Sequence, residues 1–266
     1  MNGETGFIYA ATGKKHVREA EVSATRLLKV MPDANVVLFT DDISLMSDVF
    51  HNILQLEDAK GHCSDKIEAI TKSPFKKSIF LDTDTYICEE LSDVFFMLDK
   101  YDFAMAQSPY RYPYESCAVD AFPELNSGVM AWRSNELTKK CLVEWQEILE
   151  KQKKDSFADA QDQHALRDAL YLSDATLWVL PPEYNFRSDY PGFIGKGSRV
   201  KIIHGREVDI ADVHDRLNVS NENRITLACL ESLTKENLIF INGSKVVNCF
   251  YSLVRGLQFF VRVFRK

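Results

Sequence analysis

The sequence lacks the short patterns that mark several common classes of protein. It contains no G-x-G-x-x-G and no Walker sequence, which excludes the ordinary dinucleotide-binding and P-loop classes. Its six cysteines form no C-x-x-C pair and show no regular spacing, which indicates scattered reduced thiols in a cytosolic type of protein. The chain opens without a basic n-region or a long apolar run, so we expect no signal peptide.

The chain also lacks an excess of positive charge. It carries 32 basic and 39 acidic residues, a formal charge of −7, which argues against a general nucleic-acid binder because phosphate backbones demand a basic face. Hydrophobic residues make up 45% and charged residues 27% of the sequence, the balance of a soluble globular protein. A length of 266 residues allows one large α/β domain or two small ones.

One stretch, Lys77 to Tyr86, stands out because three apolar residues lead directly into Asp82-Thr83-Asp84. An apolar run of this kind is typical of a parallel strand that is covered on both faces. If the chain is still extended at Asp82, both carboxylates lie on one face, where they repel each other unless a cation separates them. Such oxygen ligands suit Mg²⁺ or Mn²⁺, which usually complete their shell with substrate phosphates. The structural alternative is a chance triplet, which 21 aspartates produce roughly once or twice.

The rest of the pattern predicts strands alternating with helices. A strand at Phe7–Ala11, a loop at Thr12–His16, an amphipathic helix closed by Pro32 and a strand at Asn35–Phe39 form a βαβ opening. Further along we expect a helix at 65–71, a helix start after Asp84, strands at 102–106 and 176–180, and a strand over 200–206 that ends near His204. A small polar turn at 126–128 opens another buried strand, and Ser134 is the expected N-cap of a helix reaching about residue 154. Residues 108–125 read as an irregular, substrate-facing loop.

The order of these motifs carries a resemblance to a known family. The βαβ opening, the Asp82-Thr83-Asp84 triplet, Asn126-Ser127-Gly128, Asp162-Gln163 and Ile202-Ile203-His204-Gly205 follow one another over roughly residues 7–206. The ordered set resembles the nucleotide-sugar-dependent glycosyltransferases of the GT-A fold, the glycogenin-like and lipopolysaccharide-galactosyltransferase group. The resemblance implies a single Rossmann-like α/β domain with a mixed central sheet, which binds a UDP-sugar with Mn²⁺ or Mg²⁺ and transfers the sugar with retention to a glycan, lipid-linked or protein acceptor.

The same resemblance implies roles for individual residues. The metal ligands would be Asp82, Asp84 and His204, and the residues near the anomeric carbon would be Asp162 and Gln163. Nucleotide contacts would come from Ala10, Ala11, Thr12, His16, Lys66 and Thr83, and sugar or diphosphate contacts from Asn126, Ser127 and Arg206. The family's longer His-x-x-Gly-x-x-Lys run is here His204-Gly205-Arg206, so Arg206 takes the place of the family's lysine.

Two alternatives from other classes remain open at this point. The Asp82-Thr83-Asp84-Thr85 run also resembles the start of the haloacid-dehalogenase phosphatases, with Asp82 as nucleophile, although that family places the motif on its first strand. A non-catalytic nucleotide-sugar-binding protein is the second, but a degenerate site tends to lose a ligand, whereas all three are present.

The C-terminal segment is predicted to be distinct from the transferase domain. We expect a transferase domain at 1–210, an extension at 211–244 and a basic amphipathic helix at 245–266, which has five basic residues and no acidic ones. Its wide apolar face and cationic flanks predict an anchor on an anionic membrane surface, for a cytoplasmic protein that is peripheral on the membrane. A helix packed on the domain is the alternative.

Overall fold

The computed structural model describes residues 3–44, 47–111, 114–155 and 161–206, with short stretches between 214 and 242. The predicted helix at 245–266 and most of the predicted extension at 211–244 lie outside the described residues, so both remain predictions. Within the described part of the chain, no helix is long and apolar enough to cross a membrane.

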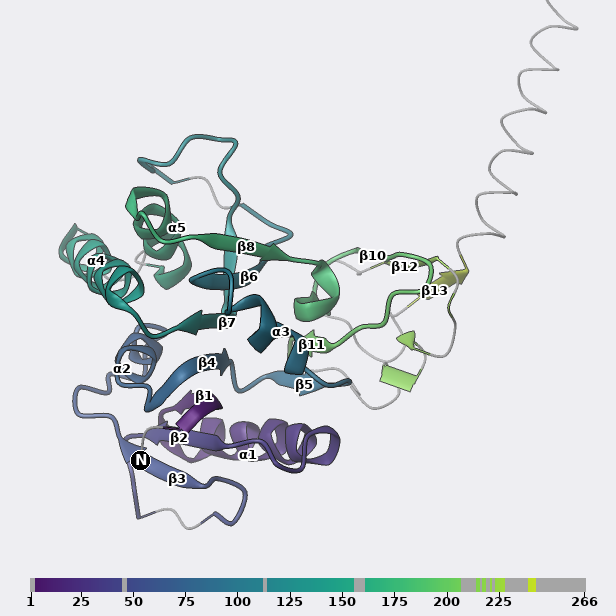
Figure 1. Cartoon of the computed structure of the whole chain (residues 1–266), viewed down its shortest axis with the longest axis horizontal. Helices are drawn as coiled ribbons and strands as arrows, with labels where there is room; N and C mark the ends of the chain where they lie inside the picture. Colours follow the sequence, from purple (N-terminus) through teal and green to yellow (C-terminus); the bar gives the residue numbers. More distant parts are fainter. Residues whose placement is uncertain are drawn as a thin grey trace, which may run out of the picture.

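A seven-stranded sheet in the order β3-β2-β1-β4-β7-β6-β8 forms the centre of the molecule (Figure 1). The strands are β1 (Gly3–Ala11), β2 (Val36–Thr40), β3 (Asn52–Gln55), β4 (Phe75–Leu81), β6 (Phe103–Gln107), β7 (Leu125–Arg133) and β8 (Leu177–Leu180). Strand β7 runs antiparallel to its neighbours β4 and β6, whereas the other described pairings in this sheet are parallel. The predicted mixed α/β sheet is therefore confirmed.

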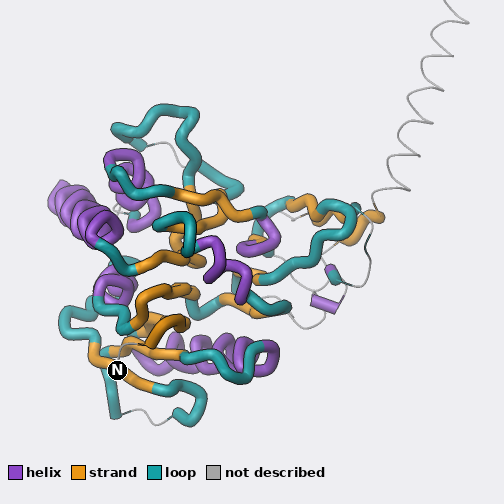
Figure 2. Tube along the Cα trace, in the orientation of Figure 1, coloured by secondary structure: helices purple, strands orange, loops and turns teal. Residues whose placement is uncertain are grey.

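Helices cover both faces of this sheet (Figure 2). Helices α1 (Gly13–Val30) and α3 (Ser92–Met97) pack on one face, and α2 (Asp65–Thr71), α4 (Glu136–Asp155) and α5 (Asp162–Leu172) pack on the other. The two-residue period of a strand divides β4 between the two cores, because Ile79 and Leu81 join the α1 side while Phe80 joins the α2 side. The carboxyl half of the strand is buried on both sides, which is why Ile79-Phe80-Leu81 form the apolar run before Asp82.

The connections reverse direction at β1. The chain passes from β1 through α1 to β2 on one face, and from β3 through α2 to β4 on the other face, so β1 and β4 are neighbours with helices on opposite sides. In open α/β sheets, ligands bind in the crevice outside the carboxyl ends of the strands at such a switch point. The triplet Asp82-Thr83-Asp84 follows the carboxyl end of β4, and Thr12 follows that of β1.

Two small sheets lie beside this edge. One has the order β5-β11-β9 and the other β10-β12-β13. The remaining elements are β5 (Thr85–Ile87), the 3₁₀ helix η1 (Pro182–Asn185), β9 (Phe186–Arg187), β10 (Gly192–Ile194), β11 (Ile202–His204), β12 (Arg224–Leu227) and β13 (Ile239–Asn242). Strand β11 pairs antiparallel with β5 and sets His204 opposite Thr85. This pairing brings a residue from a distant part of the chain to the end of β4.

Four local predictions were wrong. The chain after Asp84 forms β5 before any helix, because pairing with β11 outweighs the local pattern. Residues 126–128 lie inside β7, where neighbours on both sides hold them extended. The predicted loop at 12–16 is mostly the first turn of α1, which starts at Gly13.

The fourth wrong prediction concerns the N-cap of α4. Asn135, rather than Ser134, caps the helix: its Oδ1 accepts from the Thr138 backbone N–H at 2.9 Å, while Thr138 Oγ1 accepts from the Asn135 N–H at 3.0 Å. Ser134 instead donates its backbone N–H to the Lys76 carbonyl.

Candidate active site

The two aspartates converge by a turn rather than by an extended strand. The backbone N–H of Thr85 donates to the Asp82 carbonyl at 3.2 Å, and the Thr85 hydroxyl donates to the same oxygen at 2.8 Å. The chain therefore leaves β4 at Asp82 and turns into β5. The expectation that an extended strand places both carboxylates on one face was wrong, because a turn brings them together. Its conclusion, that both carboxylates reach one place, is what the structure shows.

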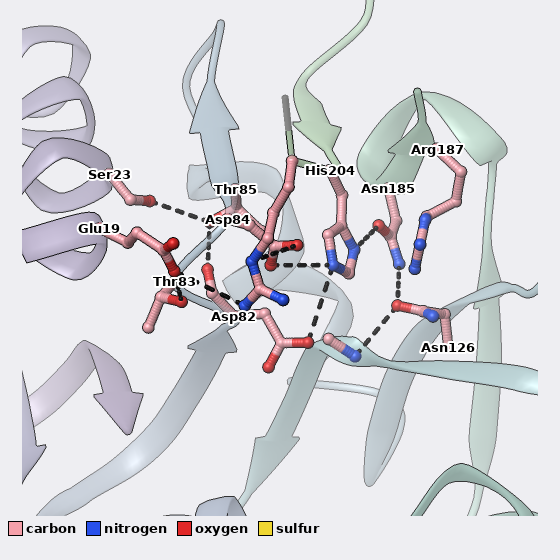
Figure 3. A network of polar contacts seen from close by, with 12 residues as sticks. Glu19, Ser23, Asp82, Thr83, Asp84, Thr85, Asn126, Asn185, Arg187 and His204 are labelled. Atoms are coloured by element: carbon pink, nitrogen blue, oxygen red, sulfur yellow. Dashed lines mark hydrogen bonds and ion pairs between the residues drawn. The ribbon is translucent and has the colours of Figure 1, made fainter. Parts of the chain in front are cut away.

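His204 completes a compact group of potential ligands (Figure 3). Its Nε2 lies 3.4 Å from Asp84 Oδ1 and 3.7 Å from Asp82 Oδ2. One ligand atom from each of these three residues lies within 4.8 Å of the others. Two carboxylates and an imidazole suit Mn²⁺, and carboxylate-rich sets also suit Mg²⁺. The three residues therefore fit the divalent cation that the sequence predicts.

Gly128 keeps room for this group. A Cβ atom at Gly128 would lie 2.2 Å from His204 Cε1 and 2.5 Å from Asp82 Oδ2. Both distances are far below van der Waals contact, so a side chain at this position would push two of the three ligands away. The glycine of Asn126-Ser127-Gly128 is thus required by close approach, and its backbone is extended in β7.

Positive charge borders the carboxylates on one side through Arg206. Its Nε lies 3.9 Å from Asp84 Oδ2, and its Nη2 lies 3.6 Å from Glu19 Oε2. Burial alone would raise the pKa of Asp84, but His204 and Arg206 together hold it well below its ordinary value. Asp84 is therefore ionised at neutral pH and able to bind a cation.

Lys66 borders the carboxylates on the other side and joins two parts of the site. Its Nζ lies 3.0 Å from Asp82 Oδ1 and 3.3 Å from Asp162 Oδ2, and the residue is 9% exposed. Burial favours the neutral amine, but the charges of Asp162 and Asp82 raise the pKa of Lys66 above its usual value. Asp162 is buried too, and Lys66 with the Ser127 hydroxyl, 2.7 Å away, lowers its pKa despite that burial.

A pocket of about 420 Å³ opens over the carboxyl ends of β1 and β4. It brings together every residue predicted for the metal and the nucleotide, together with Arg206: Ala10, Ala11, Thr12, His16, Lys66, Asp82, Thr83, Asp84, His204 and Arg206. The Thr12 hydroxyl donates to Asp65 at 3.0 Å, and His16 is hydrogen-bonded to Glu19 at 3.0 Å.

A second pocket of about 240 Å³ adjoins the first and shares Cys63, Lys66, Asp82 and Arg187 with it. It is lined by the remaining predicted residues, Asn126, Ser127, Asp162 and Gln163. The Asn126 amide donates to Gln163 Oε1 at 2.9 Å, and Ser127 donates to Asp162. The predicted site residues therefore gather in two connected hollows at one sheet edge.

A larger hollow of about 580 Å³ lies between α2 and α4. Charged side chains line it, and several already pair with each other, such as Lys72 with Glu68 at 2.8 Å and Lys153 with Glu150 at 2.9 Å. These neighbours are surface ion pairs without a group of ligand atoms that converge, so the chemistry belongs to the two smaller pockets.

Sequence reasoning missed three residues of the site. Asn185 is hydrogen-bonded to His204 Nδ1 at 2.8 Å, Arg187 lines both pockets, and Glu124 accepts from Gln163 Nε2 at 3.1 Å. Asn185 and Arg187 follow Pro181-Pro182 in a stretch where nothing in the local pattern separates them from neighbouring polar residues. Only the pairing of β9 with β11 places them beside His204.

Comparison with known proteins shows a similarity to nucleotide-diphospho-sugar transferases. A family model described as nucleotide-diphospho-sugar transferase matches residues 76–199, the part of the chain that contains Asp82, Asp84, Asn126 and Asp162. No curated protein matches the sequence.

Solved structures share the fold at low sequence identity. The glycosyltransferase GlyE of Streptococcus pneumoniae TIGR4 superposes with a TM-score of 0.56 and 16% identity, over 77% of this chain and 56% of GlyE. The galactosyltransferase LgtC, solved in complex with donor and acceptor sugar analogs, has a TM-score of 0.53 and 12% identity, over 76% of this chain and 88% of LgtC. The bifunctional glycosyltransferase WbbM has a TM-score of 0.50 and 12% identity, over 77% of this chain and 46% of WbbM.

These likenesses confirm the predicted fold. The chain has the GT-A-like fold of these transferases, and the family model identifies it as similar to nucleotide-diphospho-sugar transferases. The predicted GT-A-like fold is therefore confirmed, and the family model over residues 76–199 supports the predicted glycosyltransferase class. The chain spans 56% of the length of GlyE at 16% identity. The donor, the acceptor and the metal are therefore proposed below from the site itself.

Proposed function

We propose that the protein is a metal-dependent glycosyltransferase that moves a sugar from a UDP-sugar to a glycan, lipid-linked or protein acceptor, with retention. The observation that carries this proposal is the approach of Asp82, Asp84 and His204 to within 4.8 Å at the switch point of the sheet. All three line the pocket of about 420 Å³, and Asp82 also lines the adjoining smaller pocket. A diphosphate that reaches from the larger pocket into the smaller one would pass Asp82.

Asp82, Asp84 and His204 would hold Mn²⁺ or Mg²⁺. Such a cation, when bound, neutralises the charge that develops on a leaving diphosphate. The chain also supplies cations of its own, because Arg206 borders the nucleotide pocket beside Asp84 and Lys66 lies between the two pockets. Preorganised charges aimed at a leaving group stabilise the transition state more than the ground state.

The smaller pocket would receive the transferred sugar. In the reaction, the bond from the anomeric carbon to the diphosphate breaks and its electron pair leaves with the diphosphate, while the acceptor hydroxyl forms a new bond to that carbon and passes its proton to a diphosphate oxygen. Asp162 stays ionised beside Lys66, so its carboxylate is able to stabilise positive charge on the sugar ring. Attack from the face of the leaving group would give retention. Gln163 and Asn126 would orient the sugar, and an LgtC variant with an active-site glutamine changed to glutamate offers a parallel in a protein of this fold.

The two alternatives make different use of the same residues. A phosphatase would need Asp82 free as nucleophile, yet Lys66 binds one of its oxygens at 3.0 Å and the other points toward His204. The transferase fold and family model also favour sugar transfer over phosphate hydrolysis. A non-catalytic sugar-binding protein would share the pockets but would not need three converging metal ligands.

A screen of nucleotides and nucleotide-sugars tests the proposal. UDP with Mn²⁺ should stabilise the folded protein by about 2.7 kcal/mol at a hundredfold excess over its dissociation constant, and GDP or CMP should do much less. Equal stabilisation by all three would remove the uridine assignment. Mn²⁺-dependent release of UDP from one UDP-sugar would establish turnover, whereas phosphoaspartate on Asp82 and phosphate release from monoesters would establish the phosphatase instead.

We also propose, from the sequence pattern alone, a cytoplasmic protein held at anionic membrane surfaces by residues 245–266. The protein should sediment with anionic liposomes, and deletion of 245–266 should release it without unfolding the domain. An insoluble truncated protein, together with an intact protein that ignores anionic vesicles, would identify the segment as part of the folded core.

A further inference from the structure

A continuous chain of side-chain hydrogen bonds leads away from the metal ligand His204. His204 Nδ1 lies 2.8 Å from Asn185 Oδ1, Asn185 Nδ2 lies 2.8 Å from Asn126 Oδ1, and Asn126 Nδ2 lies 2.9 Å from Gln163 Oε1. Gln163 Nε2 then lies 3.1 Å from Glu124 Oε1. Figure 3 shows its first members, His204, Asn185 and Asn126, in a row to the right of the two aspartates. The chain runs through the interior, since Asn185 is 4% and Asn126 7% exposed.

Only one direction of donation satisfies this chain. The backbone N–H of Gly128 donates to Asn126 Oδ1 at 3.0 Å, and a backbone N–H cannot accept, so the Asn126 atom that faces Asn185 is the oxygen. Asn185 must therefore present its NH₂ to Asn126 and its oxygen to His204. At the far end, the Glu124 carboxylate accepts from Gln163, which turns the Gln163 oxygen toward the Asn126 NH₂. Both ends impose the same orientation on every amide.

The consequence falls on the imidazole of His204. Asn185 Oδ1 can only accept, so Nδ1 must carry a proton, and Nε2 is the nitrogen that faces Asp82 and Asp84 at 3.7 and 3.4 Å. The partner of one ring nitrogen sets the role of the other in metal-binding histidines. Without the Asn185 carbonyl, the ring could rotate, and Nε2 would no longer be held toward Asp82 and Asp84.

We propose that Asn185 is a positioning residue that holds His204 with Nδ1–H on its own carbonyl and Nε2 toward the metal. Through Asn126 and Gln163, the same hydrogen-bonded unit reaches the smaller pocket, so the ligand geometry and the sugar-facing amides are set together. Glu124, buried at 2% exposure, is the anchor at the far end. This inference rests on the proposed metal dependence, but the orientation of the ring can be measured without a metal.

The first experiment reads the ring in the metal-free protein. Nitrogen-15 NMR of the imidazole should show a protonated Nδ1 for His204 in the wild type, with its proton retained in a hydrogen bond. An unprotonated Nδ1 would overturn the proposal, whatever the protein does with Mn²⁺. The measurement needs no variant and therefore does not depend on how a substitution folds.

The second experiment compares two substitutions of Asn185 by Mn²⁺ titration. Asn185→Leu has a similar size but cannot accept, so Mn²⁺ affinity should fall about 10- to 100-fold. Asn185→Asp keeps an acceptor for Nδ1–H, so affinity should stay within about threefold of wild type or rise, as for an intact outer-shell partner. Equal losses in both variants, or no loss in the leucine variant, would overturn the proposal.

A matched control separates positioning from loss of a buried amide. Asn218 is also buried, and it forms two hydrogen bonds to the Val200 backbone at 2.9 and 3.0 Å, away from the ligands. Asn218→Leu should lower thermal stability and leave Mn²⁺ affinity unchanged. If the wild type binds no Mn²⁺, the proposed metal chemistry fails, and the Nδ1 measurement alone decides the orientation of His204.

Discussion

Carboxylates at the two ends of the central sheet have different surroundings: Asp102 is buried, whereas Asp82 and Asp84 are partly exposed. At the amino end of β6, Asp102 is 1% exposed and accepts four hydrogen bonds: two from Thr176 at 2.7 Å, one from Asn135 at 2.6 Å and one from Arg133 at 2.8 Å. At the carboxyl end of β4, Asp82 and Asp84 face His204 at 3.4 Å or more. Asp102 is saturated with donors, whereas Asp82, although paired with Lys66, and Asp84 stay 27% and 15% exposed and accessible to a further ligand.

The number of donors and the exposure of a carboxylate distinguish a structural carboxylate such as Asp102 from a functional one such as Asp84. Hydrogen bonds to the charged form stabilise a buried carboxylate fully, so nothing further can bind Asp102. Asp82 and Asp84 each keep an oxygen aimed at a shared point where further ligand atoms also converge. Lys66 and Arg206 offset part of the repulsion between the two carboxylates, and a bound cation would offset more, which indicates a binding site rather than a core contact.

The largest effect should follow from removing a ligand at the open end. Asp82→Asn, Asp84→Asn and His204→Ala should each lower activity by at least about 100- to 1000-fold, because the charge on the leaving group loses its stabilisation. Mn²⁺-dependent nucleotide binding should be lost as well, while circular dichroism and thermal unfolding show an intact fold. Asp102→Asn serves as the matched control and should retain the activity of the folded protein. Full activity in EDTA, or in all three ligand variants, would remove the metal site.

Removing the cation at each end should give the next largest effect. Lys66→Met leaves Asp82 and Asp162 without their shared partner in a buried place, and we expect a loss of about 3 kcal/mol in unfolding free energy. Arg133→Met should cost less, about 1 kcal/mol, because Asp102 keeps three other donors and the Arg133 side chain is 35% exposed. Chemical denaturation measures both. An equal loss of unfolding free energy in Lys66→Met and Arg133→Met would contradict the view that Asp102, unlike Asp82 and Asp162, has enough other donors.

Acid should lower the stability of the folded protein through protonation of Asp102. Burial opposes ionisation, but the hydrogen bonds from Thr176, Asn135 and Arg133 lower the pKa of Asp102 from 3.8 to about 2. The folded state therefore holds fewer protons than the unfolded state at low pH. The resulting stabilisation, about 2 kcal/mol, is complete above about pH 4 and is lost as the pH falls toward about 2. Asp102→Asn should flatten this part of the stability profile; an unchanged slope over this acid range would refute the assignment.

Prediction from the sequence succeeded where local pattern and chain order carry the information. The apolar run before Asp82 announces a strand buried on both faces, and the helix at 65–71 appears with the predicted bounds. The resemblance carried by the ordered motifs named Asp82, Asp84, His204, Lys66 and Asp162, and the structure brings them to one edge of the sheet. The local pattern alone did not assign them roles, and His204 reaches the edge only because β11 pairs with β5.

The rest depends on contacts between distant parts of the chain. β5 exists because β11 pairs with it, and Asn185 belongs to the site because β9 lies beside β11. Glu124 is recognisable only once Gln163 lies against it. The cap of α4 failed for a related reason: both Ser134 and Asn135 are good capping residues, and the pairing of Ser134 with Lys76 across the sheet leaves the cap to Asn135.

The smallest expected change in stability comes from the N-cap of α4, where Asn135 also donates to Asp102. Asn135 accepts from the Thr138 N–H with its oxygen and donates to Asp102 with its amide. Asn135→Ala removes both bonds and should lower the unfolding free energy by about 1 to 2 kcal/mol, whereas Ser134→Ala should change it by less than about 0.5 kcal/mol. Asn135→Asp keeps the cap but sets a carboxylate against Asp102, so it should be the worst of the three at neutral pH and recover toward wild type as the pH falls below about 4. Denaturation at two pH values measures all three. If Ser134→Ala proves the more costly alanine variant, the helix begins one residue earlier than the structure shows, and Asp102 is less saturated than its four hydrogen bonds indicate.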